Sequence, residues 1–254
     1  MLHVLKRHPF AVTAFFRHSL VLTYAFPREV LQPLLAPGLV LDTYDAYGFL
    51  AIALVQTERL RPSFFPPLLG RDLLLTGYRI FVRLGNAASA LRGLQIIRTD
   101  TNQRWMVNSG NLFTHYNYNL CQAQLAERPG EIEWAIRTPG KQADVQVRAW
   151  PADTPAPLPS GSLFLNESEA RRFAGPLPYT FDYEPQTHSI IRIQGVRRNW
   201  NPVSIRAEVV EAAFFSHEPF CRATPLLANA FYVHHTNYQW LRGVRTPLNG
   251  TCTG

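Results

Sequence analysis

Polar side chains concentrate in residues 110–120 of this sequence, within a stretch that otherwise has the character of a buried strand. The segment reads Gly-Asn-Leu-Phe-Thr-His-Tyr-Asn-Tyr-Asn-Leu. Imidazole, amide and phenol groups can donate hydrogen bonds to a bound molecule, and imidazole can also exchange protons with it. We therefore take this segment as the candidate site and treat the rest of the chain as the scaffold that positions it.

An extended conformation would sort these side chains onto two faces. If residues 114–122 form a strand, the two-residue period places His115 and Asn117 on one face and Tyr116 and Tyr118 on the other. The polar face would meet either solvent or a cavity. In a cavity, His115 could act as general acid and base, while the amide and phenol groups could stabilise a developing oxyanion. These four residues are the candidate catalytic set, and only a bulge would let all of them act together.

Arginines supply nearly all of the positive charge. The net charge is +7, and the arginines stand singly along expected strands rather than in runs. A guanidinium matches the geometry of a carboxylate or phosphate, so arginines facing one interior could hold a small anion. The candidate substrate-binding residues are the arginines Arg79 and Arg98, together with Asp100 and Asn111. Arg98 and Asp100 would share a face of one strand, so a simple ion pair explains them equally well.

The sequence offers little support for a metal or a bound cofactor. Cys121, Cys221 and Cys252 lie far apart and form no CxxC pair, so they suggest neither a zinc knuckle nor a disulfide framework and fit a reducing compartment. His234 and His235 are adjacent and would point apart on a strand or diverge by about 100° on a helix. Dinucleotide-binding, phosphate-loop, GxSxG and HExxH motifs are all absent. We expect no cofactor and no metal.

The sequence also limits the classes of partner that we expect. No basic patch or nucleic-acid-binding module is present, so we expect no nucleic-acid partner. The N-terminal residues lack the order of a signal peptide, and no apolar run approaches the ~20 residues of a membrane span. We expect a soluble, cytoplasmic protein whose partner is a small molecule, an anionic one given the arginines.

The expected elements are mostly strands. β-branched and aromatic residues bounded by turn signals predict strands over residues 19–26, 39–44, 47–60, 73–84, 90–101, 131–138, 143–150, 187–198 and 203–215. Short helices are expected over 28–35, 166–173 and 225–240, the second capped by Asn166 and Glu169. About ten strands predict one mostly antiparallel β domain of the α+β type over residues 1–242, closed or nearly closed to avoid edges. Residues 243–254 are expected to form a loose tail.

Several of these segments resemble a known family. Arg-His-Ser-Leu-Val-Leu-Thr-Tyr at residues 17–24, followed by Leu-Leu-Ala-Pro-Gly-Leu-Val-Leu-Asp at 34–42, is similar to the opening of acetoacetate decarboxylase-like proteins, and most of all to their uncharacterised YqjF-like branch. Residues 77–83, 91–101 and 162–173 extend the resemblance. It implies a cone-shaped antiparallel β-barrel with a central polar cavity and a few short helices, assembled as a homo-oligomer.

The resemblance also bears on the site. In acetoacetate decarboxylase a barrel lysine forms a Schiff base with a β-keto acid, and an arginine of the first strand binds carboxylate. Arg17 matches that arginine and is a further candidate for substrate binding. The segment that would carry the lysine instead contains Asn111 and Asn117, and neither Lys6 nor Lys141 lies near it in the sequence. We therefore do not expect Schiff-base decarboxylation.

Two functions remain open. The first is a cofactor-independent lyase, hydratase or isomerase acting on an oxo- or carboxylate-bearing metabolite. The second is a non-catalytic protein that binds or senses a small ligand in the same cavity. The sequence does not distinguish between them.

Overall fold

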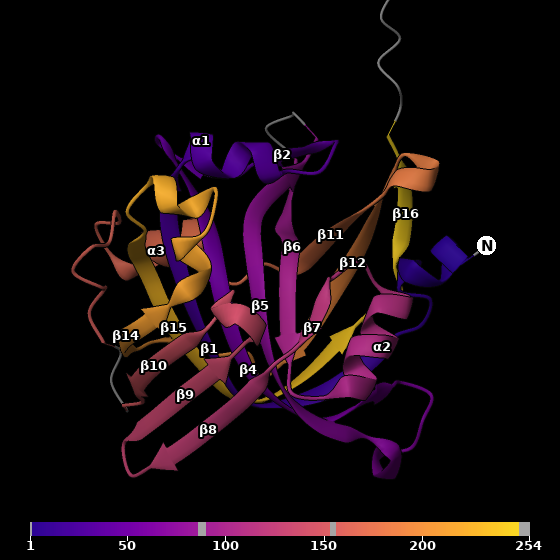
Figure 1. The fold of residues 1–254 in the computed structure, drawn as a ribbon, viewed down its shortest axis with the longest axis horizontal. Coiled ribbons are helices and arrows are strands. Elements are labelled where there is room, and N and C mark those ends of the chain that lie inside the picture. Colours follow the sequence, from indigo (N-terminus) through magenta and orange to yellow (C-terminus); the bar gives the residue numbers. More distant parts are fainter. Residues whose placement is uncertain (1, 86–89, 153–155, 249–254) are drawn as a thin grey trace, which may run out of the picture.

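Seven strands form a ring in the computed structural model, which describes residues 2–85, 90–152 and 156–248 (Figure 1). In their order around the ring they are β15 (Leu226–Trp240), β1 (Val12–Pro27), β4 (Tyr47–Pro62), β5 (Arg71–Leu84), β6 (Leu91–Thr101), β11 (Tyr179–Glu184) and β12 (Ser189–Arg198). Pairing of β12 with β15, from Gly195–Trp240 to Arg198–Asn237, returns the sheet to its first strand. Neighbouring strands are antiparallel except β6 and β11, which are parallel at the pair Thr180–Leu94.

A second sheet packs on the outside of the ring. It contains β8 (Gln122–Arg128), β9 (Glu131–Arg137), β10 (Val145–Trp150) and β14 (Arg206–Ala212) in the order β14-β10-β9-β8. Figure 1 shows these strands lying diagonally across β1 and β4. Trp134 of β9, fully buried, belongs to the same hydrophobic cluster as Leu50 and Ile52 of β4. The face of β4 that points away from the ring interior is therefore buried as well.

Burial on both faces explains the composition of the ring strands. Along β4, Leu50, Ile52 and Leu54 point to the second sheet, while Ala51 and Ala53 point into the ring. A strand covered on both sides is read as a continuous apolar run rather than as an alternation. Ala51 and Ala53 are small and leave space inside the ring at this level.

Helices and short strands complete the chain. The helices are α1 (Arg28–Leu31), α2 (Arg104–Phe113) and α3 (Glu167–Ala174), and the remaining strands are β2 (Leu39–Leu41), β3 (Thr43–Tyr44), β7 (Tyr118–Leu120), β13 (Val203–Ser204) and β16 (Val244–Pro247). Short 3-10 turns occupy η1 (Leu2–Arg7), η2 (Gln32–Leu34), η3 (Pro67–Leu69), η4 (Pro139–Lys141), η5 (Pro185–Thr187), η6 (Ala213–Ser216) and η7 (Phe220–Arg222). None of the helices in the described part of the chain is long and apolar enough to cross a membrane.

The helix at residues 167–174 begins as its sequence predicts. The side chain of Asn166 accepts a hydrogen bond from the backbone N–H of Glu169 at 3.0 Å. The Glu169 carboxylate reaches back to the N–H of Leu165. Two backbone donors at the helix start are thereby satisfied by side chains.

The strand expected over residues 114–122 does not form as one element. Helix α2 extends to Phe113, a turn follows, and only β7 pairs with β6. The turn is fixed by Asn111, whose side chain exchanges two hydrogen bonds with the backbone of Tyr118, and by Asn117, which adopts a left-handed φ of 50°. Amide side chains that bond to nearby backbone compete with a regular strand, and here they end it.

Two further expectations were wrong. Residues 225–240 form β15 rather than a helix, because this segment pairs with β1 along its length and closes the ring. The tail expected to be loose from residue 243 begins with β16, which pairs with β12. Residues 249–254 of that tail lie outside the described residues. Strands β8 and β11 were not predicted.

Candidate functional site

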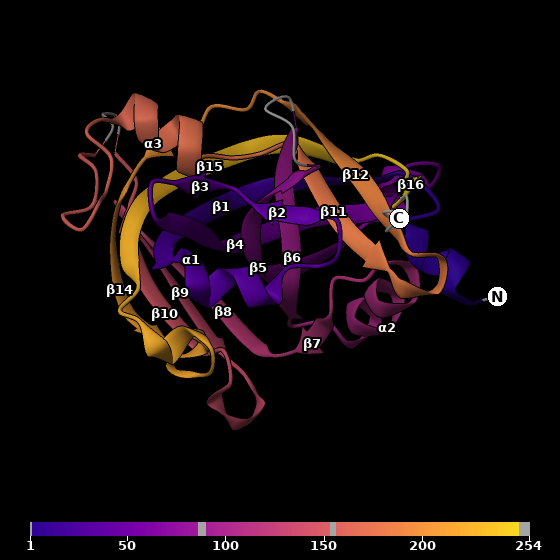
Figure 2. The ribbon, with the colours of Figure 1, turned by 90° about the horizontal axis from the view of Figure 1, so that it is seen from above.

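A cavity of about 280 Å³ lies inside the ring. Seen from above, β15, β12 and β11 continue the curve of β1, β4, β5 and β6, and α2 lies beside β7 (Figure 2). Small residues of the ring, among them Ser19, Ala51, Ala53 and Gly77, form part of the lining. Helix α2 contributes a single face, which consists of Trp105, Met106, Ser109, Gly110 and Phe113.

Arg79 of β5 is a buried cation of this lining. Its Nε is buried and has no hydrogen-bond partner. The neighbouring groups that act on its pKa are three tyrosines and Arg197. None of these groups is a carboxylate. Burial lowers the pKa of the guanidinium, yet an arginine stays protonated in a protein. An uncompensated cation therefore faces the cavity.

Gly77 makes room for this guanidinium. A Cβ added to Gly77 would lie 3.0 Å from Nε and 3.2 Å from Nη2 of Arg79. The two residues share one face of β5, so the arginine side chain folds back across the glycine. The position of the cation is thus set by the absence of a side chain beneath it.

The three tyrosines near Arg79 are Tyr116, Tyr118 and Tyr238. Burial raises the pKa of the Tyr116 and Tyr118 phenols well above the ordinary value, so both are neutral hydrogen-bond donors. The Tyr116 hydroxyl is buried beside the Thr180 side chain, and it makes no hydrogen bond of ordinary geometry within the described residues. Glycines accommodate the other two, because a Cβ at Gly110 would lie 2.3 Å from the Tyr118 ring and one at Gly195 would collide with the Tyr238 hydroxyl.

A second arginine of the lining is already engaged. Arg197 donates a hydrogen bond from Nη2 to the carbonyl of Leu177 and lies over the ring of Trp200, with Cζ 4.4 Å from the ring centroid. It also lies 5.8 Å from the centroid of Tyr238. These contacts hold Arg197 to the wall, although its own Nε is also buried without a hydrogen-bond partner in the described part of the chain.

Two groups could hold or accept a proton. His8 lines the cavity, and burial lowers its pKa to about 4, so its imidazole is neutral at neutral pH with Nδ1 unpartnered. Asp182, two residues from the lining residue Thr180 on β11, is buried, and burial raises its pKa to about 8. Its Oδ2 has no partner, and it lies close enough to influence Tyr116.

The structure brings together only some of the residues proposed from the sequence. Arg79, Tyr116 and Tyr118 line the cavity, and Asn111 supports it by fixing the backbone of Tyr118. His115 and Asn117 are not part of the lining. His115 is half-buried, and its backbone approaches Asp182.

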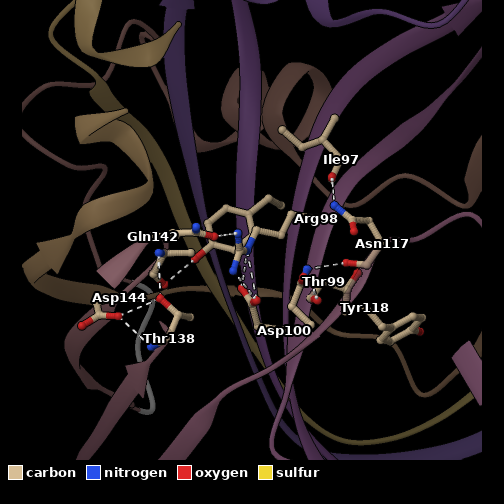
Figure 3. Close-up of polar contacts among 12 residues, drawn as sticks. Ile97, Arg98, Thr99, Asp100, Asn117, Tyr118, Thr138, Gln142 and Asp144 are labelled. Atoms are coloured by element: carbon tan, nitrogen blue, oxygen red, sulfur yellow. Dashed lines mark hydrogen bonds and ion pairs between the residues drawn. The ribbon is translucent and has the colours of Figure 1, made fainter. Parts of the chain in front are cut away.

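Three other proposed residues lie on the opposite side of the sheet or at its surface. Arg98 and Asp100 form an ion pair of 2.9 Å, with Arg98 also bonded to Gln142 near the second sheet. Figure 3 shows this pair on one side of β6 and the Tyr118 ring pointing away from it. Arg17 is exposed and pairs with Glu58 at 3.1 Å.

Residues missed by sequence reasoning come from distant parts of the chain. His8, Asp182, Arg197 and Tyr238 reach the site because β11, β12 and β15 close the ring. Gly77 and Gly195 on ring strands were the available signals, since a glycine within a strand often marks a close approach. Within the described residues, no cluster of three or more histidine, cysteine or acidic side chains is arranged to hold a metal ion.

Solved structures share this architecture. Acetoacetate decarboxylase from Legionella pneumophila subsp. pneumophila str. Philadelphia 1 superposes with a TM-score of 0.63 at 10% identity, over 94% of this chain and 88% of that one. An acetoacetate decarboxylase-like enzyme from Sphingomonas wittichii RW1 gives 0.61 at 14% identity, over 95% and 94%. The enduracididine biosynthesis enzyme MppR, complexed with pyruvate, gives 0.61 at 10% identity, over 93% and 90%.

Identities this low establish the fold alone, and they confirm the acetoacetate decarboxylase-like architecture that the sequence resemblance implied. No curated protein sequence matches this chain significantly. The family model DUF2071, described as an uncharacterised conserved protein, matches residues 13–237. That match spans most of the chain and all seven ring strands except Val12 of β1 and the last residues of β15. The chain therefore belongs to the DUF2071 family, and its fold is that of the acetoacetate decarboxylase-like proteins.

Proposed function

We propose that this protein is a small-molecule enzyme of the acetoacetate decarboxylase-like type that binds an organic anion on Arg79. The observation that carries the proposal is the Arg79 guanidinium inside the ring, whose buried Nε has no hydrogen-bond partner among the described residues. Leaving a buried charge uncompensated costs free energy, so such a group is retained where a ligand supplies the counter-charge. A carboxylate is the simplest metabolite group that does so in a bidentate geometry.

The reaction we propose is a lyase, hydratase or isomerase step on an oxo- or carboxylate-bearing substrate. Proton removal beside a carbonyl creates an enolate, whose negative oxygen needs hydrogen-bond donors. Tyr116 and Tyr118 are neutral donors close to Arg79, and Tyr116 has an unused hydroxyl. His8, neutral in the lining, is the group best placed to take the proton. His115 and Asn117 have no part in this scheme.

The position of the lysines supports a reaction without a Schiff base. Lys6 belongs to η1, Lys141 is exposed on η4, and neither lines the cavity. Borohydride treatment in the presence of a β-keto acid should therefore leave the protein mass unchanged. A covalent adduct on either lysine would overturn this part of the proposal.

The anion site is tested by comparing two arginines. Arg79→Met should weaken the binding of a carboxylate about 100-fold, the equivalent of ~3 kcal/mol, because charge-assisted hydrogen bonds are lost. Arg17→Met is the matched control, since Arg17 is an exposed side chain paired with Glu58, and it should change Kd less than about twofold. Isothermal titration with carboxylates that stabilise the protein to heat provides the readout. Equal effects of the two substitutions would end the role of Arg79.

A non-catalytic ligand-binding protein is the second candidate. It is favoured by the lining, in which no aspartate or glutamate occurs among the described residues. His8→Gln separates the two functions. In an enzyme this change should lower kcat more than it raises KM, whereas in a binding protein no turnover of any bound carboxylate should be measurable and Kd alone should respond.

A further inference from the structure

We propose that the cavity takes organic anions with an aromatic or branched apolar body, rather than short oxo acids such as pyruvate. This inference rests on the proposed function, because it assumes that Arg79 holds the anionic group. It adds the class of substrate and the direction in which that substrate lies.

The anionic end is located by the strand register. The Arg79 guanidinium lies over Gly77, which is paired with Ala53 of β4, and Ala53 is in turn paired with Val21 of β1. This row of the ring is small and apolar. An anion bound to the guanidinium therefore has hydrocarbon on the side of this row, while the three tyrosines provide the polar groups near Arg79.

From this row the lining continues as apolar surface toward the β4–β5 connection. Val55 and Leu75, paired in the next inward-facing row, line the cavity, and Leu60 follows on β4. Trp105 and Met106 of α2 contribute further apolar lining. A ligand whose anionic end is held at Arg79 would extend its remaining atoms along this path.

The other cations along the lining are already occupied. Arg61 donates to the carbonyls of Phe65 and Arg59 and so is turned toward its own loop. Arg197 is held by Leu177 and Trp200. The Arg79 guanidinium, with hydrocarbon on one side of it, selects an anionic group carried by an apolar body.

The size of the cavity agrees with this. Its volume of about 280 Å³ is many times the ~10–15 Å³ that a cavity needs to hold one water molecule. A three-carbon oxo acid would leave much of that space to water beside tryptophan and leucine side chains, where water finds few partners. An aryl or branched alkyl chain fills the space and removes the same surface from water.

A graded series of carboxylates tests the inference on the unmodified protein. Acetate, butyrate, hexanoate and phenylpropionate would be titrated by calorimetry, with phenylpropanol as the uncharged match of the last. Each buried methylene should tighten binding about fourfold, the equivalent of ~0.8 kcal/mol. Phenylpropanol should bind at least about 30-fold more weakly than phenylpropionate, since it lacks the charge that pairs with Arg79.

The outcomes separate this inference from the proposed function. If acetate and pyruvate bind through Arg79 and longer carboxylates bind no better, the apolar body is refuted while the anion site stands. If no carboxylate binds, or if phenylpropanol binds as tightly as phenylpropionate, both are refuted.

A substitution that fills part of the cavity tests where the apolar part of the ligand lies. Val55→Phe narrows the apolar path one inward-facing row beyond Gly77, so hexanoate and phenylpropionate should weaken at least about tenfold and acetate should not change. Unchanged acetate binding also shows that the variant folds. Val210→Phe, on an exposed position of β14, is the matched control and should affect none of the ligands. Equal weakening of acetate and hexanoate by Val55→Phe would place the body elsewhere and overturn this route.

Discussion

Buried charged and ionisable side chains are arranged in opposite ways on β6 and on its two ring neighbours, β5 and β11. On β6, Arg98 pairs with Asp100, whose side chain is 0% exposed, in the layer between the ring and the second sheet. On β5 and β11, Arg79 faces the cavity with its Nε unpartnered, and Asp182 is buried with one carboxylate oxygen unpartnered. The first arrangement is closed, and its polar groups serve the fold. The second leaves polar groups unsatisfied, which is the usual cost of a site prepared for a ligand.

The largest effect should come from the unpaired carboxyl. Burial raises the pKa of Asp182 to about 8, so the folded state keeps a proton that the unfolded state releases near pH 4. Stability should therefore fall as the pH rises from about 4 to 8 and level off above 8. Asp182→Asn removes this dependence, which amounts to about 5 kcal/mol at ~1.4 kcal/mol per pKa unit. Urea unfolding of both proteins at several pH values measures it, and parallel curves would show that the carboxyl is ionised in the folded protein.

The paired carboxyl should respond in the opposite direction. Asp100→Asn leaves the Arg98 guanidinium, whose side chain is 13% exposed, with Gln142 as its remaining side-chain partner. Removing one partner of a buried ion pair costs about 3–5 kcal/mol, so this variant should be less stable at neutral pH. Carboxylate affinity should stay within about twofold because the pair lies outside the cavity lining. A loss of ligand binding in a folded Asp100→Asn variant would show that this ion pair also serves the ligand site, which would contradict its assignment to the fold alone.

The sequence predicted the scaffold better than the site. Strands such as β4, β5 and β6 were predicted almost to their ends, because their β-branched and apolar residues fit only a buried strand. The same property led to the wrong prediction of a helix at β15. An apolar run that is buried on both faces does not distinguish a strand from a helix. Strand β8, with polar residues at alternate exposed positions, and the short β11 gave too weak a pattern to be found.

The function of an arginine depended on details that the sequence does not contain. Arg79 and Arg98 were both proposed, and nothing local separates them. A register shift between Tyr78 and Arg79 fixes which residues of β6 face β5, so Arg98 lies opposite Tyr78 on the outer layer while Arg79 lies inside. Tyr116 and Tyr118 were found from their chemistry, although the strand meant to carry them is mostly a turn. His8 and Tyr238 enter only because distant segments meet when the ring closes.

A smaller effect is expected from the buried imidazole. Burial lowers the pKa of His8 to about 4 from an ordinary value of 6.5, so the unfolded state binds a proton that the folded state refuses. Stability should therefore be complete above pH 6.5 and fall by about 3 kcal/mol as the pH drops toward 4. His8→Gln should remove that fall, which opposes the trend from Asp182 over the same range. Thermal unfolding of the variant and the parent at pH 4.5 and 7 compares the two, and an unchanged difference would mean that His8 is solvated in the folded state.

The smallest change should act on the ligand and hardly on the fold. In Gly77→Ala the new methyl group would lie 3.0 Å from Nε of Arg79, the end of a flexible side chain, so the guanidinium can shift aside. The free energy of unfolding should change by less than about 1 kcal/mol, because alanine loses less backbone entropy than glycine in a strand. The anion, however, would meet a displaced cation, and its Kd should rise about tenfold. Gly161→Ala is the matched control, since a Cβ there has 3.8 Å to its nearest neighbour and lies outside the cavity lining. Equal affinities of the two alanine variants for the carboxylate would mean that the ligand binds with Arg79 in either position. The exact position of Arg79 on β5 would then matter no more for ligand binding than the Arg98–Asp100 pair on β6.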